Sequence, residues 1–152
     1  CRSRGLHVAV DTCGLARQED LLAVAALTDL FLYDLKFMDD AKHRHYTGVS
    51  NAVILDNLRA LGRVHGRIWV RVPIIPGIND DPANLEAAAR FAAAVSGVQQ
   101  VNLLPFHRTG LPKLRRLGQD SSLAETEPPS AAAMNRAVDI FTRAGLAVKQ
   151  GG

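Results

Sequence analysis

The sequence predicts an α/β fold, an arc of about four to five parallel strands with outer helices that forms part of a TIM-barrel-like (β/α) barrel. Three observations predict it. Apolar, β-prone runs alternate with runs of helical period, loops rich in Gly, Pro, Asn and Asp separate them, and the strand–loop–helix unit repeats. Such units form parallel sheets with right-handed crossovers. An open doubly wound sheet would also suit, but so few strands favour an arc over a closed barrel.

The first half of the chain begins this alternation. Residues 6–10 are β-prone, and residues 18–26 carry apolar side chains at helical spacing. Residues 29–36 form an apolar run that starts and ends beside acidic residues. This run predicts the central strand of the sheet, buried on both faces by helices.

Two helices are expected next. Asp39 and Asp40 can cap a short helix that continues through Tyr46. Ser50 or Asn51 then caps a second helix, whose apolar stripe repeats with the helical period as far as a terminating glycine.

The second half repeats the pattern. Residues 68–75 are the most β-prone run and stop at a turn signal over 76–81. Pro82 suits the first position of a helix that continues as an alanine-rich run over 85–95. The remaining elements are a strand at 98–104, an irregular stretch at 108–129, a helix at 130–144 and a short strand at 146–149.

Composition bounds the class of protein. The 152 residues are 47% hydrophobic and 22% charged, which predicts a single globular domain over 1–152. A net charge of +3 is too small to indicate nucleic-acid binding. The two cysteines, Cys1 and Cys13, form neither a disulfide framework nor a complete metal site, which favours a reducing, cytoplasmic location. No apolar run is long enough for a membrane span, and no signal peptide opens the chain.

The start of the chain is unusual. Its first residue is Cys1 rather than Met, and residues 1–5 resemble the last turn of a helix that closes on a glycine. We therefore expect the sequence to be a portion of a longer protein.

Polar side chains follow the apolar runs at the carboxyl ends of the predicted strands. Asp34 and Lys36 share one face of their strand, because side chains alternate along a strand. The carboxyl ends of parallel strands meet at one rim, where α/β proteins hold their ligands. The residues expected at this rim are Asp11, Thr12, Asp34, Lys36, Arg71 and His107.

These residue types suit a small polar ligand. Carboxylates and a hydroxyl form a hard-oxygen pocket for a cation, while lysine, arginine and histidine donate to a carboxylate, a phosphate or a ribose hydroxyl. Each residue also has a structural interpretation. Asp11 and Thr12 could cap the next helix, and Arg71 could pair with a neighbouring acid. His107 could be an ordinary loop histidine, and Cys13 has no activating neighbour. The histidines expected on solvated helix faces are His43, His45 and His65.

Several blocks of the sequence resemble a known family. They are Val-Asp-Thr-Cys-Gly at 10–14, Leu-Tyr-Asp-Leu-Lys at 32–36, Thr-Gly-Val-Ser-Asn at 47–51, Trp-Val-Arg-Val-Pro-Ile-Ile-Pro-Gly-Ile-Asn-Asp at 69–80, Leu-Leu-Pro-Phe-His at 103–107 and Pro-Pro-Ser at 128–130. In content and order they resemble the glycyl-radical-enzyme activating enzymes, the pyruvate formate-lyase activating group of the radical SAM superfamily.

The resemblance implies an oxidoreductase built on a partial (β/α)6 barrel that holds a 4Fe–4S cluster and S-adenosylmethionine. Reductive cleavage of that cofactor, with reduced flavodoxin or ferredoxin as electron donor, yields a 5′-deoxyadenosyl radical. The radical takes a hydrogen from a glycine of the partner, a pyruvate formate-lyase-like glycyl radical enzyme. No nucleic acid or membrane partner is implied.

The resemblance also implies roles for residues of this chain. Those matching monovalent-cation ligands are Asp11, Thr12 and Asp34, and those matching the S-adenosylmethionine pocket are Lys36, Arg71, Leu104 and His107. Leu104 would lie near the adenine. No residue here matches a catalytic one.

Two motifs of the family are missing from the sequence. The Cys-x3-Cys-x2-Cys run that holds the cluster is absent, as is the Gly-Gly-Glu segment that binds the methionine amino group. In the family both precede the position of Cys1. We therefore expect the later two-thirds of an activating enzyme, inactive by itself.

Two alternatives stay open. The chain could be a non-catalytic docking module, or could self-associate through an unpaired strand edge. It could also be an aldolase-like enzyme with Lys36 as a Schiff-base lysine, although the neighbouring Asp34 should keep that amine charged.

Overall fold

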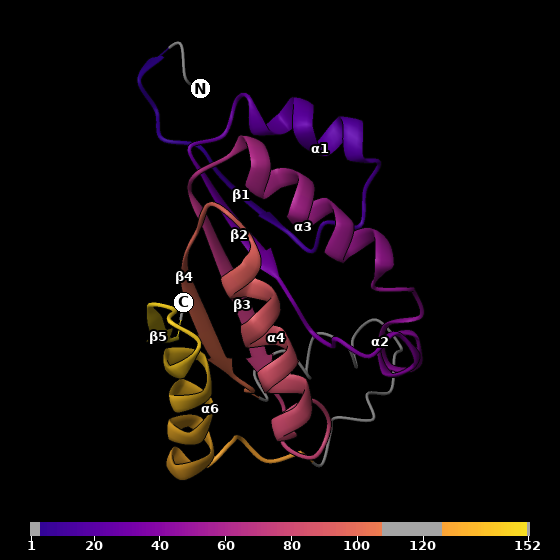
Figure 1. Cartoon of the computed structure of the whole chain (residues 1–152), viewed down its shortest axis with the longest axis vertical. Coiled ribbons are helices and arrows are strands. Elements are labelled where there is room, and N and C mark those ends of the chain that lie inside the picture. The colour runs from indigo at the N-terminus through magenta and orange to yellow at the C-terminus, as the bar shows by residue number, and fades with distance from the viewer. Residues whose placement is uncertain (1–3, 108–125, 152) are drawn as a thin grey trace.

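The structure is a computed structural model that describes residues 4–107 and 126–151. Parallel strands and helices alternate along the described chain (Figure 1). The strands are β1 (Ala9–Thr12), β2 (Leu30–Asp34), β3 (Ile68–Ile74), β4 (Val98–Pro105) and β5 (Val148–Gln150). The helices are α1 (Gln18–Ala25), α2 (Asp40–Thr47), α3 (Ala52–Val64), α4 (Pro82–Ala94) and α6 (Ala131–Arg143).

The five strands form one sheet in the order β1-β2-β3-β4-β5, and every neighbouring pair is parallel. Each strand therefore lies beside the next strand in sequence. A doubly wound sheet reverses its strand order at a switch point, and this sheet does not. The predicted arc of parallel strands is confirmed, although the central strand is β3 and not the predicted β2.

Capping residues define where three helices begin. The side chain of Asp39 accepts a hydrogen bond from Lys42 N at the start of α2, and Asp81 and Ser130 do the same for α4 and α6. Pro82 occupies the first turn of α4, as predicted. At the start of α3 the Asn51 side chain makes no capping bond, because it points elsewhere.

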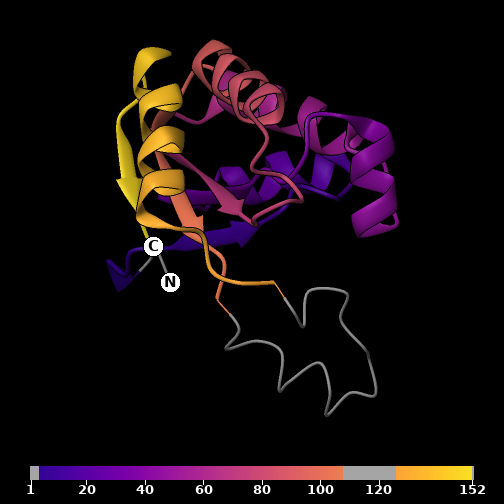
Figure 2. The same cartoon turned by 90° about the horizontal axis from the view of Figure 1, so that it is seen from below.

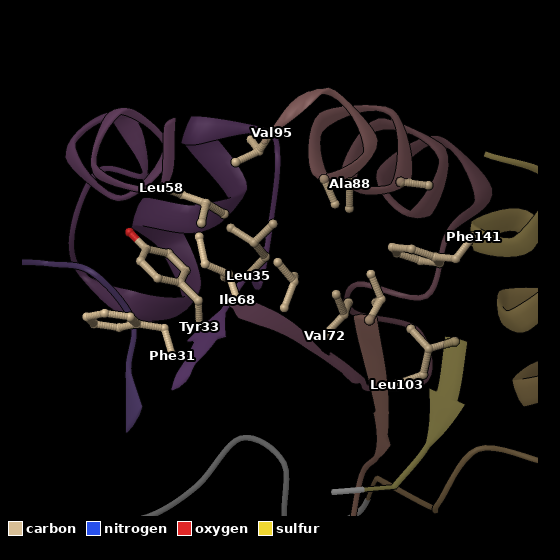
Figure 3. Packing of buried hydrophobic residues seen from close by; sticks show 14 of the residues in the cluster. Phe31, Tyr33, Leu35, Leu58, Ile68, Val72, Ala88, Val95, Leu103 and Phe141 are labelled. Carbon is tan, nitrogen blue, oxygen red and sulfur yellow. The ribbon is translucent and has the colours of Figure 1, made fainter. Parts of the chain in front are cut away.

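The hydrophobic core lies on one face of the sheet. Figure 2 shows α3, α4 and α6 on the same side of the strands, and Figure 3 shows strand side chains pointing toward those helices. Along β2, buried Phe31 and Tyr33 alternate with half-buried Leu30, Leu32 and Asp34. The expectation that this strand is buried by helices on both faces is therefore wrong, since the described helices cover one face only.

Two of the histidines expected in solvent are enclosed. His43 is only 3% exposed, and its Nδ1 lies 2.8 Å from Val49 O, because the loop after α2 folds back over the ring. His65 is half-buried with Nε2 3.1 Å from Thr28 O, and its ring meets Phe31 edge-on. His45 is exposed, as predicted.

Three further comparisons with the sequence concern the ends and loops. β1 begins at Ala9 rather than at residue 6, so Asp11 and Thr12 lie within the strand. Most of the predicted irregular stretch, residues 108–125, lies outside the described residues, as does Cys1. Within the described ranges, no helix combines the length and the apolar character that a membrane crossing requires.

Candidate functional site

Arg71 joins two aspartates from neighbouring strands on the face of the sheet that the helices leave open. It lies in β3 directly opposite Asp34 at the end of β2. Its Nε and Nη2 both lie 2.8 Å from Asp34 Oδ1, and Nη2 also donates to Asp11 Oδ1 of β1. The Arg71 side chain is 17% exposed, so these charges meet in a partly desolvated environment. Three strands thus contribute to one ion-pair network.

Lys36 extends this network beyond the end of β2. Its Nζ lies 3.6 Å from Asp34 Oδ2, so the two oxygens of Asp34 face different cations. We call Asp11, Asp34, Lys36 and Arg71 the acid–base cluster. It contains two carboxylates and two cations, and therefore has no net charge of its own.

The electrostatics favour a permanently charged Arg71. Burial of the guanidinium works against its charged form, but the hydrogen bonds to Asp11 and Asp34 and their negative charge outweigh this. The pKa of Arg71 consequently lies above its ordinary value. Arg71 is a fixed positive charge at the centre of the acid–base cluster.

Thr12 is the predicted rim residue that the structure separates from the others. In register it lies opposite Tyr33, whose side chain is buried on the helix-covered face, whereas Asp11 lies opposite Leu32. The Thr12 hydroxyl accepts a hydrogen bond of 2.9 Å from Gly14 N. The sequence pattern of an acid followed by a hydroxyl thus places its two members on opposite sides of β1.

Leu104 lies on the open face of the sheet, and His107 follows the same strand. Leu104 is half-buried and lies opposite Pro73 of β3, two residues beyond Arg71, so it shares the open face. His107 lies two residues past the end of β4 and is exposed. Leu104 therefore offers an apolar surface on the face that carries the cationic groups, whereas among the described residues no hydrogen bond or ion pair joins His107 to the acid–base cluster.

Sequence reasoning missed three buried asparagines that hold the chain around Lys36. Asn51, Asn79 and Asn84 donate to backbone oxygens of residues 36–38, and Asn84 also accepts from Met38 N. In sequence each asparagine lies at or near a helix start, where such residues normally cap. No local signal distinguishes a capping asparagine from one that bonds to a distant strand.

The donor set fits some of the implied cofactors. The carboxylates of Asp11 and Asp34 are the ligand type that a hard cation prefers, and Arg71 supplies the positive charge between them in this structure. Lys36 and Arg71 suit a carboxylate, and Leu104 suits an apolar ring. A group of three or more His, Cys, Asp or Glu side chains placed to hold a metal does not occur within residues 4–107 and 126–151.

A 4Fe–4S cluster does not fit the residues of this chain. The cluster needs three thiolates at close spacing, whereas the sequence holds Cys1 and Cys13 only. Cys13 is half-buried in the loop after β1.

Comparison with known proteins gives a consistent set of relatives, although no family model matches the chain. The chain is 38% identical over its full length to the trans-4-hydroxy-L-proline dehydratase activating enzyme of Clostridioides difficile, of which it covers 51%. It is 31% identical over 95% of its length to the pyruvate formate-lyase 1-activating enzyme of Escherichia coli, of which it covers 60%. The chain thus spans about half the length of the curated relatives it matches.

Solved structures agree with these relatives. A domain of the pyruvate formate-lyase-activating enzyme from Bacteroides vulgatus superposes with a TM-score of 0.84 at 32% identity, over 100% of this chain and 85% of that one. A radical SAM methyltransferase from Sphaerobacter thermophilus gives a TM-score of 0.62 at 22% identity, over 93% of this chain and 39% of that one. The second likeness concerns the fold alone.

Proposed function

The chain belongs to the glycyl-radical-enzyme activating enzymes, and on that basis we propose that it forms the S-adenosylmethionine-binding part of a cytoplasmic radical SAM oxidoreductase. The substrate protein would be a glycyl radical enzyme, with reduced flavodoxin or ferredoxin as electron donor. The observation that carries the proposal is the acid–base cluster, which gathers charged side chains from three strands on the open face of the sheet.

Lys36 and Arg71 would bind the carboxylate of S-adenosylmethionine. The Lys36 side chain is 36% exposed and its ammonium lies a relatively long 3.6 Å from Asp34, so it can turn toward a ligand. Arg71 is held by two aspartates and contributes a fixed positive charge. Leu104 would pack against the adenine, and His107 would close the pocket at its mouth.

Asp11, Thr12 and Asp34 would hold a monovalent cation beside the ligand carboxylate. Asp11 is 61% exposed, so its carboxylate can leave Arg71 for a cation with little repacking. Thr12 would join this site only after a local rearrangement of β1, because its side chain faces the helices and its hydroxyl accepts from Gly14 N here.

S-adenosylmethionine, when reductively cleaved at a cluster, supplies the hydrogen-abstracting chemistry of these enzymes. The residues of this chain bind and orient that cofactor, and its two cysteines do not supply the cluster. The structure therefore supports a binding role for this chain within such an enzyme.

A chimera tests the proposal. This chain replaces the matching stretch of the Clostridioides difficile relative, and the chimera is reconstituted with iron and sulfide without oxygen. We expect iron–sulfur absorbance and 5′-deoxyadenosine formation on reduction. In Lys36→Met we expect the absorbance to remain and 5′-deoxyadenosine formation to be lost. Arg136→Met, on α6, is the control and should behave as the parent chimera. A chimera that holds the cluster but forms no 5′-deoxyadenosine contradicts the proposal.

The edge of the sheet favours a second, non-exclusive role. β1 is an edge strand, and no other described strand pairs with its outer side. Exposed strand edges pair readily with other chains, so β1 could pair with a second copy of this chain or with another protein. Sedimentation over a hundredfold range of concentration tests the first of these, because a constant monomer mass would contradict self-association.

A further inference from the structure

The backbone just after β2 is fastened by side chains rather than by neighbouring strands. Leu35 N donates to Arg71 O at 2.9 Å, which is the last ladder bond between β2 and β3. Residues 36–38 then leave the sheet but stay partly buried, with Phe37 stacked on Tyr46 of α2 and Met38 N bonded to Asn84 of α4. Buried backbone groups need partners, so this segment requires hydrogen bonds from elsewhere.

Two asparagines from the β3–α4 region hold one side of this segment. Asn79 Nδ2 donates to Lys36 O at 3.2 Å and to Pro73 O at 2.7 Å, and its Oδ1 accepts from Ile75 N. Asn84 Oδ1 accepts from Met38 N at 2.9 Å, and its Nδ2 donates to Asn79 O at the same distance. Asn79 is fully buried and Asn84 is 6% exposed.

A third asparagine holds the other side of the segment. Asn51 Nδ2 donates to Phe37 O at 3.1 Å and to Met38 O at 2.9 Å. We call Asn51, Asn79 and Asn84 the asparagine clasp. Its members come from three separate positions in the sequence, and an amide suits this task because it offers both donors and an acceptor.

The clasp has a direct consequence for Lys36. Asp34 is fixed by its place in β2 and by Arg71, whereas Lys36 lies outside the strand. Leu35, bonded to β3, fixes the chain before Lys36, and the clasp holds the backbone at and after Lys36, which together place its Cα so that the ammonium reaches the open face beside Asp34.

We propose that Asn79 and Asn84 are positioning residues that aim Lys36 at the cofactor carboxylate. This inference rests on the proposed function, because it assumes that Lys36 contacts S-adenosylmethionine. The two asparagines lie under the segment and act through its backbone. A side chain that contacts a ligand is held in place by the residues packed around it. When those supporting residues are removed, the protein binds the ligand more weakly, although the contacting side chain is intact.

The first experiment measures the Kd for S-adenosylmethionine by equilibrium dialysis with the purified chain. Asn84→Ala should raise the Kd about tenfold, the size of one well-made hydrogen bond. In a Lys36→Met background, Asn84→Ala should raise it no further, because the lysine through which it acts is gone. Should Asn84→Ala fail to fold, the nearly isosteric Asn84→Asp takes its place.

Thr28→Val is the matched control. Thr28 is 5% exposed at the opposite end of β2, and its hydroxyl donates to Val24 O at 2.8 Å. The control loses a buried hydrogen bond of the same kind, so it should lower stability and leave the Kd unchanged.

The second experiment needs no cofactor. Lysine acetylation is followed by mass spectrometry, and the rate at Lys36 is divided by the rate at exposed Lys149. Asn84→Ala should raise this ratio about threefold, as expected when a part-exposed ion pair is released. Thr28→Val should leave it unchanged.

The outcomes separate the two claims. An unchanged Kd with an unchanged acetylation ratio in Asn84→Ala overturns the positioning role, and so does a Kd increase that persists in the Lys36→Met background. If Lys36→Met binds as tightly as the original chain, or if the original chain does not bind, the proposed contact of Lys36 fails. The acetylation ratio then decides the positioning role by itself.

Discussion

Gly14 and Tyr33 are packed so closely that a Cβ on residue 14 would overlap the tyrosine hydroxyl. That hydroxyl is buried and donates to Ile54 O of α3 at 2.6 Å. Burial raises the pKa of Tyr33, and nearby Cys13 adds to the increase, so the phenol stays protonated as a donor. The contact joins the loop after β1, the strand that carries Asp11, to β2 and α3.

Gly14→Ala should lower the free energy of unfolding by about 2–4 kcal/mol, because it adds an overlap in the core to the strain of a positive φ. Urea denaturation measures this loss. Gly77→Ala is the matched control, since Gly77 has the same φ of 73° but open space around it, and should cost only about 1 kcal/mol. Equal losses in the two variants would show that the Tyr33 contact is unimportant.

Arg71→Met should lower the free energy of unfolding by about 1–3 kcal/mol, because it leaves Asp34 partly buried without its guanidinium partner. The loss should be smaller in Arg71→Met combined with Asp34→Asn, where no charge is stranded. Thermal or urea unfolding of the two single variants and the double variant gives the coupling. Additive losses would contradict the pairing seen here.

Binding of S-adenosylmethionine should depend on the monovalent cation. We expect a Kd several-fold lower in potassium than in tetramethylammonium, which is too large for an oxygen pocket, and we expect Asp11→Asn to remove the difference. Equilibrium dialysis in the two salts measures it at equal ionic strength. Asp20→Asn serves as the control, because Asp20 pairs with Arg17 on the surface of α1. A dependence that survives in Asp11→Asn would place the cation elsewhere.

Stability should fall in acid through Asp40. The Ser50 hydroxyl, then Arg44 and the Asn51 N–H, hold the pKa of this carboxyl at about 2. A depressed folded-state pKa stabilises above the unfolded value near 4, and this contribution is lost as pH falls from about 4 to about 2. The urea midpoint should therefore drop over this window, and drop less in Asp40→Asn.

Asp56→Asn is the control for the acid experiment, because it removes a surface carboxylate that pairs with Arg59 within α3. It should keep the full loss of the original chain between pH 4 and pH 2. An identical pH profile in Asp40→Asn and the original chain would contradict the role given to the Ser50 and Asn51 bonds.

The sequence by itself determined the helices and strands and the face on which the acid–base cluster lies. Apolar runs, helical stripes and capping residues are local properties, and they predicted every described strand and helix to within a few residues. The alternation of side chains along a strand put Asp34 and Lys36 on one face, and the parallel order of strands brought Asp11 and Arg71 to them.

The tertiary structure alone decided which faces and loops are covered. An apolar run in the sequence predicts a strand that is buried on both faces. The local sequence does not indicate that Thr12 faces the helices or that a loop encloses His43. The bond between Asn84 and Met38 joins residues 46 positions apart. Contacts of that range depend on how whole elements pack, so no stretch of sequence around either residue contains them, and the support of Lys36 became visible only in the folded chain.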